Sequence, residues 1–313
     1  MIKKILVPLD KSELAAQALP LARSIAMATG AEIILLSVIE PGEYWSGDPN
    51  DIPWQRAQER TASRYLDEIA GGEFRKDIAV RVRLAWGPAA STIREIAGEE
   101  NVDLIVMTTH GRSGLVRWVM GSVTNKLVHT STHPMVLVYA REECGAKEPA
   151  KIERILVPLD GSARSEAVLP IVGELALELE ATLLLERVIV PHSLLFAGEY
   201  SADRLPFLEE EAEPAQEYLD RIAAQQRSRG LTVETDVHTG HTAIAILDAA
   251  NRREADMIAL STHGRTGPGR WVIGSVADAV VRHSTLPCLV LPTREAVPAG
   301  ELRSAVAKAS ERL

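Results

Sequence analysis

The sequence predicts an α/β protein of two repeated doubly wound domains, each with a Rossmann-like, five-stranded parallel sheet in the order 3-2-1-4-5. Two stretches occur twice. ILVPLD at 5–10 returns at 155–160, and TTHGRSGLVRWVMGSVT at 108–124 returns as STHGRTGPGRWVIGSVA at 261–277. Between them, short apolar runs alternate with helical patterns, which favours a parallel sheet covered by helices on both faces. A chain of 313 residues can bury a core in each of two such domains.

Each half begins with a run that is too apolar to alternate, at 4–9 and 154–159, which predicts a strand buried on both faces. A helix is expected to follow, at 12–29 in the first half. Pro20 and Pro170 lie inside these helices and should bend or locally break them. The remaining elements come in pairs: strands at 32–39 and 181–190, helices at 54–70 and ending near 229, strands at 77–84 and 231–237, helices at 90–98 and 243–252, strands at 102–107 and 255–260, helices ending near 130 and 283, and strands at 134–139 and 287–291.

The repeat also predicts where the domains begin and end. We expect the first domain at 1–143 and the second at 153–294. The polar stretch 144–152 between them is expected to be a linker, and 295–313 a tail.

Composition predicts a cytoplasmic protein that binds neither nucleic acid nor membrane. The net charge is -9, whereas proteins that bind nucleic acid or a membrane surface usually carry a basic face; a local basic patch stays open. The apolar run at the N-terminus is too short for a signal peptide, and no segment approaches the roughly 18 apolar residues of a membrane-spanning helix. The two cysteines lack metal or disulfide spacing, which suits a reducing compartment.

The repeated stretch at 108–124 has the layout of a phosphate site. Gly111 and Gly264 lack a Cβ, so a ligand can come close to the backbone there. The Gly-Ser pairs at 121–122 and 274–275 open a predicted helix, where free N–H groups, a hydroxyl and the positive end of the helix dipole suit an anion. Sharp turns also need glycine, but recurrence in both halves favours function over a purely structural role.

Asp10 and Asp160 follow the first strand of each half. In the expected strand order the sheet reverses between its first and fourth strands, so each aspartate and its glycine loop should meet at one crevice. A carboxylate opposite a phosphate cradle suggests a bridging divalent cation or a hydrogen bond to a ribose. Capping of the next helix is the structural alternative, and Ser12 competes for that task.

A histidine and an arginine are also repeated in the loop. Arg112 and Arg265 suit phosphate oxygens, with a solvated surface position as the alternative. His110 and His263 have no repeated nucleophile and orienting acid, so we expect loop packing or ribose and phosphate contact. No catalytic residue is predicted.

Each half resembles a universal stress protein domain, whose signature is G-x-x-G, nine residues, then G-S or G-T. The spacing from Gly111 to Gly121 and from Gly264 to Gly274 keeps the nine residues. The opening VPLD, the Ser-Val-Ile that begins at Ser37, Thr-His-Gly-Arg and the later Pro-x-V-L-V at 134–138 also match. The resemblance covers nearly the whole chain.

This resemblance implies a tandem, ATP-binding stress or energy-state protein with a fold like that of adenine nucleotide alpha hydrolases. The ligand would be ATP, or ADP or AMP, with Mg²⁺ bridged through phosphates near Asp10 and Asp160 and not held by protein ligands alone. The adenine would lie near Val38 and Val188. The last strands of the halves would pair antiparallel within the chain, and a homodimer is implied. The expected nucleotide contacts are Pro8, Leu9, Asp10, Val38, Met107, Thr108, His110, Gly111, Arg112, Gly121, Ser122, Val123 and Thr124 in the first half, and Pro158, Leu159, Asp160, Val188, Leu260, Ser261, His263, Gly264, Arg265, Gly274, Ser275 and Val276 in the second.

Three departures from the family pattern predict two unequal sites, the first the better. Thr108 and Ser261 stand at the first signature glycine, which lowers affinity if that backbone needs a positive φ. Lys11 stands where the second half has Gly161 and would add a cation. Thr124 keeps a hydroxyl typical of the family, whereas the equivalent residue in the second half is Ala277.

Two other functions stay open. One is a slow ATPase or nucleotidyl transferase, although the chain has no P-loop. The other is an interaction module that kept the fold without a nucleotide, which Thr108 and Ser261 keep in play.

Overall fold

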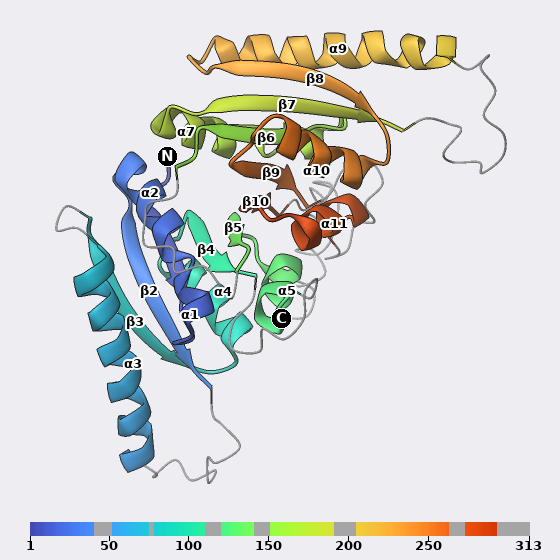
Figure 1. The fold of residues 1–313 in the computed structure, drawn as a ribbon. Helices are drawn as coiled ribbons and strands as arrows, with labels where there is room; N and C mark the ends of the chain where they lie inside the picture. The colour runs from blue at the N-terminus through green and yellow to red at the C-terminus, as the bar shows by residue number, and fades with distance from the viewer. Residues whose placement is uncertain are drawn as a thin grey trace, which may run out of the picture.

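The protein forms one ten-stranded sheet in the order β3-β2-β1-β4-β5-β10-β9-β6-β7-β8 (Figure 1). This computed structural model describes residues 1–40, 52–74, 78–109, 120–140, 151–190, 205–262 and 273–292. The first half contains β1 (Lys4–Pro8), α1 (Glu13–Ala16), α2 (Leu19–Thr29), β2 (Glu32–Ile39), α3 (Ile52–Glu73), β3 (Val80–Trp86), α4 (Ala89–Glu99), β4 (Leu104–Thr108), α5 (Ser122–Thr130) and β5 (Met135–Val138). The second half contains β6 (Arg154–Pro158), α6 (Ala163–Glu166), α7 (Leu169–Leu179), β7 (Thr182–Ile189), α9 (Leu205–Arg227), β8 (Val233–Thr239), α10 (Thr242–Arg252), β9 (Met257–Ser261), α11 (Ser275–His283) and β10 (Cys288–Leu291).

The predicted fold class and strand order are confirmed in both halves. Within each half the strands are parallel, and the first strand lies between the second and the fourth. The halves join where β5 and β10 pair antiparallel, with Val136 opposite Leu289 (Figure 1). The final strands therefore lie in the interior of one continuous sheet.

Helices cover both faces of the sheet and bury a core on each. On one face the core includes Leu21 of α2, Leu66 of α3 and Leu219 of α9. On the other it includes Ile96 of α4 and Val280 of α11. Strands at the centre bury both faces, which explains why their sequences are apolar without alternation.

The prolines in the first helix of each half break it, as expected. In the first half α1 ends at Ala16, and α2 begins at Leu19 with Pro20 in its first turn. The second half repeats this break with Pro170 in the first turn of α7. Proline suits that position because its missing N–H has no acceptor in a first turn.

The third strand of each half ends two residues later than the sequence pattern predicts. β3 pairs with β2 along its whole length, from Val80 opposite Ile33 to Trp86 opposite Ile39. An edge strand of this kind ends where its partner ends, and the apolar pattern of its own sequence does not record that limit.

The expected linker at 144–152 lies mostly outside the described residues, and the expected tail at 295–313 lies wholly outside them. The domain boundaries therefore stay predictions. Among the described helices, none combines the length and the apolar character needed to cross a membrane.

Candidate functional site

The carboxyl ends of β1, β2 and β4 bring the predicted residues of the first half together. Pro8 of β1 is level with Leu36 of β2, and Leu6 is level with Ile105 of β4. Asp10 follows β1 by two residues, at the same edge of the sheet as the ends of β2 and β4. Asp10 therefore lies at the point where the strand order reverses.

The second half repeats this arrangement at the ends of β6, β7 and β9. Pro158 is level with Glu186, and Leu156 is level with Ile258. Asp160 follows β6 by two residues, at the same edge of the sheet as the ends of β7 and β9. The predicted contacts Leu9, Met107, Leu159 and Leu260 are buried, so their side chains belong to the protein core.

The aspartates shape the turn that follows the first strand. Asp10 Oδ1 accepts hydrogen bonds from Ser12 N at 3.0 Å and from Ser12 Oγ at 2.6 Å. Ser12 Oγ in turn accepts from Ala15 N at 3.1 Å and caps α1. Asp160 and Ser162 form the same pair of contacts at 2.9 and 2.6 Å. The serine is therefore the cap, and the aspartate fixes the serine.

Lys11 holds a backbone conformation that favours glycine. Its φ is 71°, and its counterpart Gly161 has φ 82°. A side chain in this left-handed region costs on the order of 1 kcal/mol.

We therefore expect Lys11→Gly to raise the free energy of unfolding by about 0.5 to 1 kcal/mol, since it removes the Cβ strain. Gly161→Lys should lower the free energy of unfolding by a similar amount. Chemical denaturation of both variants measures the two changes. Equal effects of the same sign would contradict this account of the turn.

The glycines that open α5 and α11 use their N–H groups inside the protein. Gly121 N donates to Thr109 O at 2.8 Å, and Gly274 N donates to Thr262 O at 2.7 Å. These amides are not free for a ligand, contrary to the sequence-based expectation. The next amides, at 122–124 and 275–277, have no acceptor within their own helices, because the first turn of a helix leaves them unpaired.

The two residues at the first signature glycine do not need a positive φ. Thr108 and Ser261 are the last residues of β4 and β9, in extended backbone, and their side chains are buried. Thr124 is also buried, and its hydroxyl donates to Thr108 O at 3.0 Å. The hydroxyl that distinguishes the first half therefore ties α5 to the end of β4.

The serines at the helix starts are exposed at the same edge. Ser122 and Ser275 are the first residues of α5 and α11, each followed by a partly exposed valine, Val123 or Val276. In the second half, a hollow of about 400 Å³ lies between the starts of α10 and α11. It is lined by His241, Thr242, Ala243, Ile244, Ser275 and Val276.

Six predicted contacts lie outside the described residues. They are His110, Gly111, Arg112, His263, Gly264 and Arg265.

Two tyrosines near the aspartates, Tyr65 and Tyr218, are not among the contacts predicted from the sequence. Burial raises the pKa of Tyr65, and so does the negative charge of Asp10. Burial also raises the pKa of Tyr218, whose hydroxyl donates to Glu166 Oε1 at 3.0 Å. They occupy equivalent positions in the repeat, which was the available signal. Each stands on the helix that packs against the second and third strands of its half.

Comparisons with known proteins agree with the repeat. The model of the Universal stress protein family matches residues 1–139 and 151–292. A universal stress protein of Mycolicibacterium smegmatis is 25% identical over 299 residues, covering 93% of this chain and 97% of that protein. Universal stress protein MJ0577 of Methanocaldococcus jannaschii is 30% identical, covering 44% of this chain and 95% of that protein. The solved structure of a universal stress protein from Archaeoglobus fulgidus aligns with a TM-score of 0.67 and 21% identity, covering 92% and 98% of the two chains, and shows the shared fold.

Proposed function

Because the chain belongs to the universal stress protein family, we propose that it binds an adenine nucleotide, ATP first, in the crevice of one or both halves. Occupancy of that crevice would report stress or energy state, without a strong catalytic cycle. ADP and AMP share the adenosine and phosphate chemistry and are alternative ligands.

The observation that carries this proposal is the strand order: in both halves a carboxylate follows the first strand and a helix start follows the fourth, at the edge of the sheet where the order reverses. In the first half β1 and β4 are neighbours, with Leu6 level with Ile105, and Asp10 follows β1. Just after β4, Thr109 O accepts from Gly121 N at the start of α5. A first helical turn offers unpaired amides and a partial positive charge to a phosphate. An aspartate beside it suits a ribose hydroxyl or a phosphate-bound cation.

The residues of the crevice fit Mg²⁺ held through phosphates. Asp10 and Asp160 each supply a hard carboxylate ligand next to a helix start, and Mg²⁺ is usually bound by one or two carboxylates plus phosphate oxygens. When bound, the ion would neutralise phosphate charge. The protein itself would hold the carboxylate through Ser12 or Ser162 and leave the helix amides to the phosphate oxygens.

Gly121→Val with Gly274→Val tests the site. The added side chains would crowd the approach to the first helical turn, while φ values of -56° and -63° allow valine at both positions. We expect ATP affinity, measured by calorimetry with Mg²⁺, to fall at least tenfold, about 1.4 kcal/mol.

Gly98→Val is the matched control, because nothing lies within 4 Å of a Cβ added at that glycine. It should bind ATP as the unmodified chain does. Unchanged ATP affinity in the double variant would show that the nucleotide does not bind at these helix starts.

We also propose that the protein is not an enzyme, or at most a weak ATPase, since the predicted site has no assigned base to activate water. ATP turnover that exceeds the rate of the Asp10→Asn, Asp160→Asn double variant would favour the enzymatic alternative. Absence of any ATP binding would favour a nucleotide-free interaction module.

A cytoplasmic location and a homodimer also stay predictions.

A further inference from the structure

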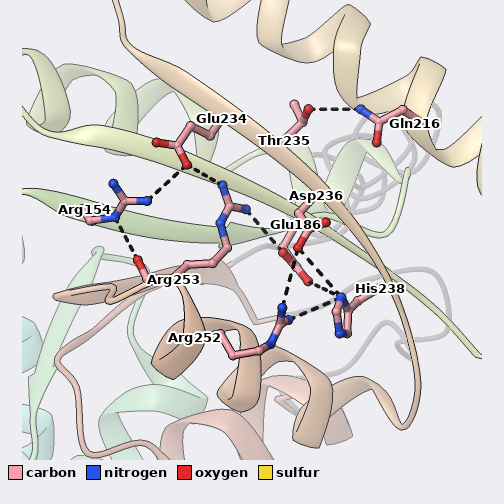
Figure 2. Close-up of polar contacts among 9 residues, drawn as sticks. All are labelled: Arg154, Glu186, Gln216, Glu234, Thr235, Asp236, His238, Arg252 and Arg253. Carbon is pink, nitrogen blue, oxygen red and sulfur yellow. Dashed lines mark hydrogen bonds and ion pairs between the residues drawn. The ribbon is translucent and has the colours of Figure 1, made fainter.

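Two acidic side chains and a histidine converge on one face of the sheet in the second half, outside the proposed nucleotide crevice. Glu186 of β7 is level with Asp236 of β8, and His238 follows two residues later on the same face. Figure 2 shows these three side chains turned toward one another and toward the end of α10. One ligand atom from each lies within 4.8 Å of the other two.

Glu186 is the unusual member of this cluster. Its side chain is 0% exposed, and Oε1 has no hydrogen-bond partner among the described residues. This oxygen lies 4.0 Å from His238 Nδ1, which is 3.8 Å from Asp236 Oδ2. A buried carboxylate oxygen without a partner is costly, and a bound cation would satisfy it.

The neighbouring arginines leave that oxygen unpaired. Arg253 contacts the other Glu186 oxygen at 3.5 Å and binds Glu234 more closely, at 3.0 Å. Arg252 lies 3.3 Å from His238 Nδ1, and its side chain is 46% exposed, so it can turn to solvent (Figure 2). Burial, and the negative charge of Asp236, raise the pKa of Glu186 to about 7 despite these arginines.

The first half lacks this cluster. The positions equivalent to Glu186, Asp236 and His238 are Leu36, Arg83 and Ala85. One neighbouring ion pair is kept with its charges exchanged: Arg81 binds Glu100 in the first half, where Glu234 binds Arg253 in the second. This ion pair is therefore present in both halves with opposite polarity. The histidine and the buried glutamate are present in the second half only.

We propose that Glu186, Asp236 and His238 form a site for one zinc-like divalent cation. Imidazole nitrogen and carboxylate oxygens at this count are zinc ligands, with a fourth position open to water. Bonds of about 2.1 Å separate tetrahedral ligands by about 3.4 Å. The two separations from His238 are 3.8 and 4.0 Å, and the Glu186–Asp236 separation is at most 4.8 Å, so side-chain movements of about 1 Å reach that value. Arg252 competes for the same histidine nitrogen and moves aside when the cation binds.

The test is titration of the EDTA-stripped full chain with zinc chloride, without nucleotide, by calorimetry and thermal unfolding. We expect one high-affinity zinc per chain and a rise in Tm. His238→Ala and Asp236→Asn should each weaken binding at least tenfold, and Arg252→Ala should strengthen it by removing a competing cation. Circular dichroism checks that each variant is folded.

His283→Ala is the matched control, an exposed histidine of the same half, and should bind zinc as the unmodified chain does. No zinc uptake by the unmodified chain would overturn the proposal. So would equal zinc affinity in the His238→Ala and His283→Ala variants, because it would assign the zinc to unrelated surface groups.

Discussion

Leu289→Asp is expected to lower the free energy of unfolding by at least about 4 kcal/mol, because it places a carboxylate in the core that joins the two halves. Leu289 of β10 is 0% exposed and lies opposite Val136 of β5. Its side chain belongs to a core that includes residues of both halves. The loss should therefore reach the first half as well as the second.

Urea unfolding followed by far-ultraviolet circular dichroism measures this loss. Leu177→Asp is the control, since Leu177 is 42% exposed on α7, and should change stability by less than about 1 kcal/mol. A small effect of Leu289→Asp would mean that the strand pair does not hold the halves together.

Glu186→Gln is expected to raise the free energy of unfolding by about 3 kcal/mol at pH 8 in the presence of EDTA, and to change it little at pH 4. The pKa of Glu186 is raised from 4.5 to about 7, by burial first and by Asp236 second. Below pH 4.5 the side chain is protonated in both the folded and the unfolded protein. As pH rises through 7, the folded protein must lose a proton that it binds more tightly, so stability falls. Glutamine removes this cost.

Glu234→Gln supplies the control with the opposite sign. A hydrogen bond from Arg253 lowers the pKa of Glu234, so its charge stabilises the folded protein above the unfolded pKa. That stability is lost as pH falls, and the glutamine variant should be less stable at pH 8. Paired denaturation curves at pH 8 and pH 4 measure both variants. Destabilisation by Glu186→Gln at pH 8 would show that Arg253 pairs with this carboxylate more strongly than the geometry indicates.

The sequence predicted the strand order well, because buried strands and repeats leave strong local signals. ILVPLD is apolar without alternation, as expected for a strand buried on both faces. Pro20 lies where the first helix breaks. The late end of β3 at Trp86 was missed, since it depends on pairing with β2.

The candidate site was only partly predictable for a similar reason. Strand order places Asp10 and the start of α5 at the same edge of the sheet, and the sequence predicts that order from its repeated pattern. The sequence pattern does not reveal that Gly121 N donates a hydrogen bond to Thr109 O. The amide of Gly121 was expected to be free for a ligand, and it is hydrogen-bonded within the protein. Glu186 lies within an apolar run of the sequence that predicts a buried strand. Only the register of β7 and β8 shows that it faces Asp236 and His238.

The most direct test of the nucleotide-binding account is to purify the full chain, denature it and quantify the released nucleotide by chromatography. We expect between one and two equivalents of adenine nucleotide per chain, or stoichiometric uptake of added ATP with Mg²⁺ by a chain purified empty. Two equivalents would show that both crevices bind, and one would show that the halves differ. A chain that releases no nucleotide and binds no added ATP would contradict the account.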